Sequence, residues 1–214
     1  MEKAIQKLWN SDIEKAWKDS LQHYYDLLTT DEMIQVESEI NNIKAEDIEK
    51  LSTEEFYEFL HNKFYIWQFP SKKRQGTTIP QLERYKTENR MNELAEIKES
   101  LFSIEHSDIS SCLETAKKLR GLGVIGASGL LAVLFPKDFG TVSAPSIESL
   151  KELNIAEYSE VLQNIKPQSP SKKEAVILIN IMRDKAEELN KKFNTDFWTP
   201  RRIDMILWSF GRSK

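Results

Sequence analysis

The chain offers few places at which a β-sheet could begin. It has seven glycines and seven prolines among 214 residues, and no segment alternates apolar and polar residues for long. Apolar residues recur instead at the spacing of a helix, as in Ser11–Leu28, where Ser11 is the expected N-cap, and in a segment that Thr53 opens and that runs to Trp67. The sequence therefore predicts an all-α fold.

The same spacing continues through most of the remaining chain. It predicts a last helix opened by Thr199 and Pro200, and before it the helices Glu93–Ile104, Ile109–Leu119 and Glu174–Phe193. Pro167–Ser171 is a break, and we expect a loop over Pro70–Pro80, because that segment contains glycine and is bounded by prolines. A chain of 214 residues fits one domain, residues 1–214, built as a two-lobed helical bundle with residues 1–50 as a lobe.

Charge and composition limit the surroundings in which the protein can work. The net charge is −4 and the isoelectric point is about 5.6, so any surface for nucleic acid must be a local patch. The single cysteine, Cys112, and three histidines that lie far apart in sequence lead us to expect no metal site and no cofactor. The N-terminus lacks the apolar stretch of a signal peptide, and the longest apolar run, Gly126–Phe135, is roughly half a membrane span. We expect a cytoplasmic monomer without membrane contact.

The segment Leu119–Leu131 carries a Gly-Leu-Gly turn between two expected helices. Glycine at 121 and 123 permits positive φ angles and lets the backbone approach a partner closely. The N–H groups at the start of the second helix carry the positive end of the helix dipole, so they can bind a phosphate without any basic side chain. An acidic protein can bind DNA in this way. The expected contacts are Gly121, Gly123, Val124 and Gly126, with Lys117, Lys118 and Arg120 adding positive charge.

The order of residues around this turn resembles the helix-hairpin-helix DNA glycosylase superfamily, in particular bacterial proteins described as 8-oxoguanine glycosylase-like. In that superfamily the second hairpin helix is followed by a loop, a hydrophobic pair and the catalytic aspartate, and the equivalent string here is Leu134–Ser143. The tail Trp198–Gly211 and the aromatic stretch Phe56–Phe69 also look like this group. The resemblance implies a helix-hairpin-helix at residues 109–135, double-stranded DNA with a flipped base as the partner, and hydrolytic excision of a damaged or modified base.

One position departs from this pattern, because the resemblance places Ser143 where the family has its aspartate. A serine cannot supply the negative charge that stabilises an oxocarbenium-like sugar as the base departs. Bifunctional members carry a lysine nucleophile at the position of Ile125, which cannot form a Schiff base, so we do not expect lyase chemistry. Three explanations stay open: DNA binding without cleavage, a substitution at Ser143, or a replacement acid, for which the candidates are Asp138, Glu148 and Asp204.

A protein that examines a base must take it out of the stack into an aromatic or apolar slot with polar groups at the edge. The stretch Phe56–Phe69 is rich enough in aromatic residues to form one, although part of it falls on a single helix face and should pack in the core. The candidates for the base pocket are Tyr65, Trp67, Gln68 and Phe69. The basic residues Lys72, Lys73 and Arg74 of the expected loop are further candidates for phosphate contacts.

Three functions follow from these features. The first is a DNA glycosylase whose target is an oxidised base, in DNA repair, or a phage-type modified base, in antiviral defence. The second is a DNA-binding protein that keeps the glycosylase fold without the chemistry. The third is a helical interaction module in which the glycine pair only closes a turn.

Overall fold

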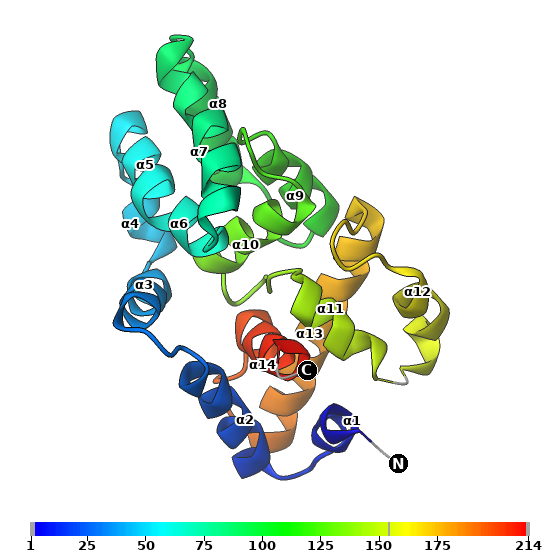
Figure 1. Ribbon diagram of the computed structural model, residues 1–214. Helices are drawn as coiled ribbons and strands as arrows, with labels where there is room; N and C mark the ends of the chain where they lie inside the picture. Colours follow the sequence, from blue (N-terminus) through cyan, green and yellow to red (C-terminus); the bar gives the residue numbers. More distant parts are fainter. Residues whose placement is uncertain (1–2, 154, 213–214) are drawn as a thin grey trace.

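The computed structural model describes residues 3–153 and 155–212, and the secondary structure within these ranges is helical, with no strand (Figure 1). The predicted all-α class is confirmed. No helix in these ranges is long and apolar enough to cross a membrane.

The first third of the chain consists of short helices followed by one longer helical segment. The N-terminal helices are α1 (Ala4–Trp9), α2 (Glu14–Asp26), α3 (Asp31–Asn41) and α4 (Ala45–Glu49). The segment predicted to run to Trp67 is a continuous rod made of α5 (Thr53–Phe59), a π-helical turn η1 (Leu60–Phe64) and α6 (Tyr65–Gln68). Two caps differ from prediction. Ser52 caps α5 in a capping box with Glu55, while α2 begins after Ile13, and Ser11 accepts a bond from the Ile13 N–H instead of capping it.

In the rest of the chain the predicted helices are present with shifts of a few residues, and the helical residues 156–164 were not predicted. These helices are α8 (Met91–Ser103), α9 (Ile109–Lys117), α10 (Val124–Leu134), α11 (Ala144–Lys151), η2 (Ala156–Tyr158), α12 (Ser159–Asn164), α13 (Lys172–Phe193) and α14 (Pro200–Arg212). Thr199 caps α14 as expected, since its hydroxyl accepts a bond from the Arg202 N–H at 3.3 Å.

The loop predicted over Pro70–Pro80 is wrong, because these residues open the helix α7 (Lys72–Thr87). Ser71 caps the helix through the Arg74 N–H at 3.3 Å. Pro80 lies inside the helix, where it removes one backbone hydrogen bond. The helix forms nevertheless because Leu82 and Tyr85 in its second half are fully buried, and this packing outweighs the local cost of glycine and proline.

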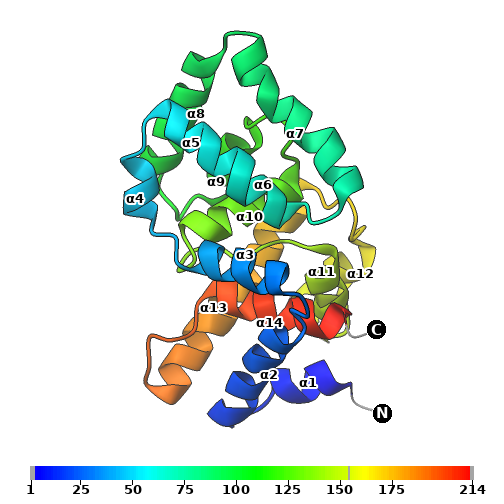
Figure 2. The same cartoon turned by 60° about the vertical axis from the view of Figure 1, so that its left-hand side comes forward.

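Helix α14 is at the centre of the lower half of the molecule in Figures 1 and 2, where it packs against α2, α11 and α13. Its apolar residues from Ile203 to Leu207 are buried, and Trp17 of α2 packs edge to face on Trp198 at 6.1 Å. Helices α5, α8, α9 and α10 pack together above it, and α10 also contacts α13 and α14. Helix α3 lies between α6 and the lower helices in Figure 2. This arrangement puts the first turn of α14 inside the protein.

Substitutions at two glycines test whether residues 72–87 form the helix α7. A Cβ at Gly76 would meet nothing within 4 Å, whereas Gly121 has a φ of +87° and a Cβ there would lie 2.9 Å from the Thr78 carbonyl oxygen. Gly76→Ala should therefore raise the free energy of unfolding by about 0.5–1 kcal/mol, since alanine favours the helix. Gly121→Ala should lower it. Urea unfolding followed by circular dichroism measures both, and a destabilising Gly76→Ala would contradict a helical α7.

Candidate functional site

The turn between α9 and α10 is fixed from behind by two buried tyrosines. The Tyr65 hydroxyl donates to the Arg120 carbonyl at 2.5 Å. The Tyr85 hydroxyl accepts from the Arg120 N–H at 3.2 Å and donates to the Lys118 carbonyl at 3.3 Å. Tyr65 was predicted to line the base pocket. This prediction is wrong, because the Tyr65 side chain is fully buried beneath the turn. Its role is to hold the turn against α6 and α7.

The start of α10 presents free backbone donors beside an exposed glycine. Gly123 is the N-cap with a φ of −88°, and a Cβ there would meet nothing within 4 Å. The first bond of the helix runs from the Ala127 N–H to the Gly123 carbonyl at 2.8 Å. That arrangement leaves the N–H groups of Val124, Ile125 and Gly126 without an intrahelical acceptor. An anion can bind here without displacing a protein hydrogen bond of the helix.

Two of the three basic residues near the turn form ion pairs within the protein, so they are less available to a phosphate than predicted. Arg120 pairs with Glu88 at 2.7 Å and Glu93 at 3.3 Å, and only 16 % of its side chain is exposed. It is held against the protein surface and is not free to reach a phosphate. Lys117 pairs with Glu114 at 3.2 Å. Lys118 is exposed beside the turn, and Lys72, Lys73 and Arg74 are exposed at the start of α7.

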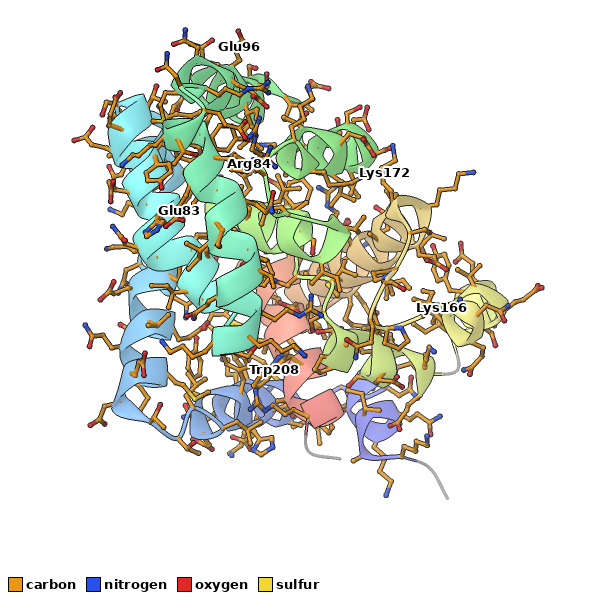
Figure 3. All side chains as sticks on the ribbon, turned by 45° about the horizontal axis from the view of Figure 1, so that its top comes forward. Glu83, Arg84, Glu96, Lys166, Lys172 and Trp208 are labelled. Carbon is orange, nitrogen blue, oxygen red and sulfur yellow. The ribbon has the colours of Figure 1, made fainter. Side chains whose placement is uncertain are left out.

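A cavity of about 390 Å³ opens where α3, α6 and the start of α7 meet α14. Its wall brings together residues from three predicted segments, namely Trp67 and Gln68, Ser143, and Asp204. Trp208 of α14 also lines it, and Figure 3 shows this residue near the N-terminal end of α7. The volume falls in the range of sites that enclose small molecules.

Ser143 is the N-cap of α11, and a chain of hydroxyl groups connects it to a carboxylate. Its Oγ accepts from the Ser146 N–H at 3.2 Å and lies 2.7 Å from the Ser146 Oγ. The Ser146 hydroxyl donates to Asp204 Oδ1 at 2.8 Å. Ser146 and Asp204 are buried, whereas Ser143 is partly exposed at the cavity wall. Ser143 is thus linked to the Asp204 carboxylate through one intervening hydroxyl.

Beneath the cavity, Arg201 binds two carboxylates. It donates to Asp204 Oδ2 at 2.7 Å and to Glu37 Oε1 at 3.0 Å, and all three side chains are almost completely buried. The Trp67 indole N–H also donates to Glu37, at 2.6 Å. Helix α3 is thereby connected to α6 and α14. With one cation for two carboxylates, the ionised cluster carries a net charge of −1.

Burial is the main influence on the titration of this cluster. It raises the pKa of the Asp204 carboxyl, opposed by the Arg201 guanidinium, the Ser146 hydroxyl and the Thr141 N–H. Burial disfavours the charge on Arg201, but Tyr24, Glu37 and Asp204 outweigh it and raise the pKa of Arg201. Arg201 therefore stays charged, and Asp204 accepts a proton more readily than an ordinary aspartate.

Two polar atoms in the cavity wall are buried without a hydrogen-bond partner among the described residues. They are Gln68 Oε1 and Thr141 Oγ1. An unpaired buried polar group costs free energy, so such atoms indicate a missing partner. Gly129 of α10 makes room for the glutamine, since a Cβ at Gly129 would overlap the Gln68 amide.

Besides Tyr65, three residues predicted for the base pocket or the chemistry lie outside this cavity lining. Phe69 packs against Tyr65, with ring centroids 5.7 Å apart, beside the start of α10. Asp138 bonds to His106 at 2.8 Å, and Glu148 is exposed on α11. Of the candidate replacement acids, only Asp204 lines the cavity.

No group of three or more histidine, cysteine, aspartate or glutamate side chains in residues 3–153 and 155–212 is arranged to hold a metal ion. The chain matches no protein-family model, and neither a curated protein nor a solved structure was found to match it.

The Arg201 cluster makes a prediction about stability. Arg201→Met leaves Glu37 and Asp204 buried without their cation, which should cost about 3–5 kcal/mol of unfolding free energy. Adding Glu37→Gln and Asp204→Asn should recover most of this loss, because no buried charge then remains. Arg212→Met, an exposed change on the same helix, should shift stability by less than about 0.5 kcal/mol. Chemical denaturation measures all three, and equal effects of Arg201→Met and Arg212→Met would contradict the account.

Proposed function

We propose that this protein binds double-stranded DNA through the turn between α9 and α10 and receives a flipped base in the cavity, where the base is excised by hydrolysis. The observation that carries the proposal is the convergence of Trp67, Gln68, Ser143 and Asp204 on one cavity. These residues come from three separate segments, and the sequence predicts a role in base binding or chemistry for each segment. A helix-turn segment with free N–H groups lies in the same molecule.

In this proposal α9 and α10 form a helix-hairpin-helix that holds one phosphate. Tyr65 and Tyr85 fix the turn, and the exposed N-terminus of α10 supplies the N–H donors. The chain then consists of two closely packed lobes. Helices α4 to α10 form one lobe, the N-terminal and C-terminal helices form the other, and the cavity lies where α6 and α7 meet α3 and α14.

The cavity has the properties that a flipped base requires. Trp67 and Trp208 offer aromatic surface, and Gln68 and Thr141 add polar side chains to the cavity wall. A base edge carries both donors and acceptors, so it can bond to polar groups of the wall while its faces contact the rings. Ser143 lies on the same wall, where the bond between base and sugar would be hydrolysed. Because Ile125 cannot form a Schiff base, the expected product is an abasic site and not a cleaved strand.

One observation favours a second candidate, a DNA-binding protein without catalysis. Asp204, the only carboxylate connected to Ser143 among the candidate acids, is buried and bonded to Arg201. In this alternative the cavity reads a base and releases it unchanged. Binding geometry is the same for both candidates, so only product formation separates them.

The phosphate contact can be tested at Gly123. Gly123→Glu adds a negative charge where a phosphate is proposed to bind, and its side chain has open space and needs no positive φ. The affinity for duplex DNA should fall roughly ten-fold, equivalent to about 1.4 kcal/mol, and the salt dependence should weaken by about one phosphate contact. Gln22→Glu on exposed α2 adds the same charge elsewhere and should leave affinity unchanged. Equal affinities of wild type and Gly123→Glu would favour the interaction module in which the hairpin is only a turn.

Base release can be tested directly. Wild-type protein is incubated with genomic DNA, with phage DNA that contains modified bases, and with a duplex containing 8-oxoguanine. Mass spectrometry of the small-molecule fraction should detect a free base from at least one of them. DNA binding without any released base would support the non-catalytic alternative.

A further inference from the structure

We infer that Ser143, Ser146 and Asp204 form a proton relay through which Asp204 acts on a water molecule at the cavity wall. The inference rests on the proposed function and names the group that performs the work of the missing aspartate. Ser143 is the member that contacts the water, and Asp204 acts through the two hydroxyls.

The direction of each hydrogen bond follows from the number of protons available. The Ser146 hydroxyl has one proton, and its contact with Asp204 Oδ1 at 2.8 Å requires that proton when the carboxylate is ionised. In the 2.7 Å contact between the two serines, Ser143 must therefore be the donor. Its oxygen accepts one bond from the Ser146 N–H at 3.2 Å and keeps one lone pair. That lone pair can accept a proton from water in the cavity.

The other oxygen of Asp204 explains why the relay ends there. Asp204 Oδ2 binds Arg201 at 2.7 Å, which leaves Oδ1 for Ser146. Arg201 is shared with Glu37, and Tyr24 of α2 also faces the cluster. Asp204 thus shares its cation with a second carboxylate. When Asp204 takes up a proton, Arg201 is still paired with Glu37 and no unpaired positive charge is left.

The bond between the sugar C1′ and the base nitrogen breaks, and its electron pair leaves with the base. The water oxygen forms a bond to C1′ while one water proton passes to Ser143, the Ser143 proton passes to Ser146, and the Ser146 proton passes to Asp204. The departing base takes a proton from solvent, and Asp204 later returns its proton to solvent. The products are a free base and an abasic sugar that carries the hydroxyl of water.

If Ser143 served only as the N-cap of α11, the hydrogen bonds among the side chains of Ser143, Ser146 and Asp204 would not be needed. A cap requires only that Ser143 Oγ accept the Ser146 N–H. The Ser146 side chain and the carboxylate of Asp204 add nothing to that bond. Ser149 provides a matched control, because it is also buried on α11 and its hydroxyl donates to α14, at the Leu207 carbonyl at 2.6 Å.

The experiment compares single-turnover base release by wild type, Ser146→Ala, Asp204→Asn and Ser149→Ala on phage DNA with modified bases and on a duplex with 8-oxoguanine. Ser146→Ala and Asp204→Asn should each lower the rate about 100-fold, the lower end of what general acid–base catalysis contributes. Their affinity for DNA should not change. Ser149→Ala should lose similar stability but keep its rate.

The pH profile separates the relay from a structural role. The rate needs ionised Asp204, whose raised pKa puts the acid limb above the range of an ordinary aspartate, so the wild-type rate should rise as pH increases through that limb. Among the described residues, Arg201 and Tyr24 are titratable groups that interact with Asp204, and Glu37 is connected to it through Arg201. Asp204→Asn should abolish the acid limb. A limb that persists in Asp204→Asn would overturn the relay.

Ser143→Asp, which places an acid directly at the cavity, distinguishes failure of the relay from failure of the proposed function. In the Ser143→Asp background, Ser146→Ala should no longer lower the rate, because the relay is bypassed. If Ser146→Ala releases the base as fast as wild type does, the relay is overturned but the proposed excision is not. Release by Ser143→Asp but not by wild type would also overturn the relay, while supporting the cavity as a base site. Release by neither would overturn the proposed excision and the relay with it.

Discussion

The bonds of Arg201 to Glu37 and Asp204 are the interaction on which the rest of the site depends. They join α3 to α14 across most of the length of the chain, and the Trp67 indole extends the connection to α6. Each of these helices contributes a wall of the cavity. Because a buried charge without its partner costs several kcal/mol, the three helices are held in a single arrangement.

The same cluster connects the fold to the proposed chemistry. One arginine serves two acids here, so the ionised cluster keeps a net negative charge. The remaining oxygen of Asp204 faces a serine hydroxyl, and that hydroxyl contacts the residue at the cavity wall. In the proposed reaction, stability and reactivity are therefore properties of one hydrogen-bonded group. The turn between α9 and α10 is held by Tyr65 and Tyr85 and not by the Arg201 cluster. The proposed phosphate contact can therefore be tested at Gly123, which lies outside the cavity lining.

Helical periodicity predicted most helices, because most of them have an apolar face. Ser143 and Asp204 were predicted from the family resemblance, and Trp67 and Gln68 from the density of aromatic residues in their segment. Periodicity failed at α7, where packing of Leu82 and Tyr85 outweighs Gly76 and Pro80. It also assigned Tyr65 to the pocket, because periodicity does not show which carbonyl a buried hydroxyl meets. Glu37 and Arg201 lie 164 residues apart, and no local pattern in the sequence connects them.

The central claim is that DNA bound at the start of α10 delivers a base to the cavity. A crystal structure of the protein with a duplex that contains an 8-oxoguanine tests this most directly. The account predicts a phosphate at the N–H groups that open α10 and an extrahelical base between Trp67, Trp208 and the Gln68 amide. A duplex seated on another face, or a bound duplex with every base stacked and the cavity empty, would contradict it.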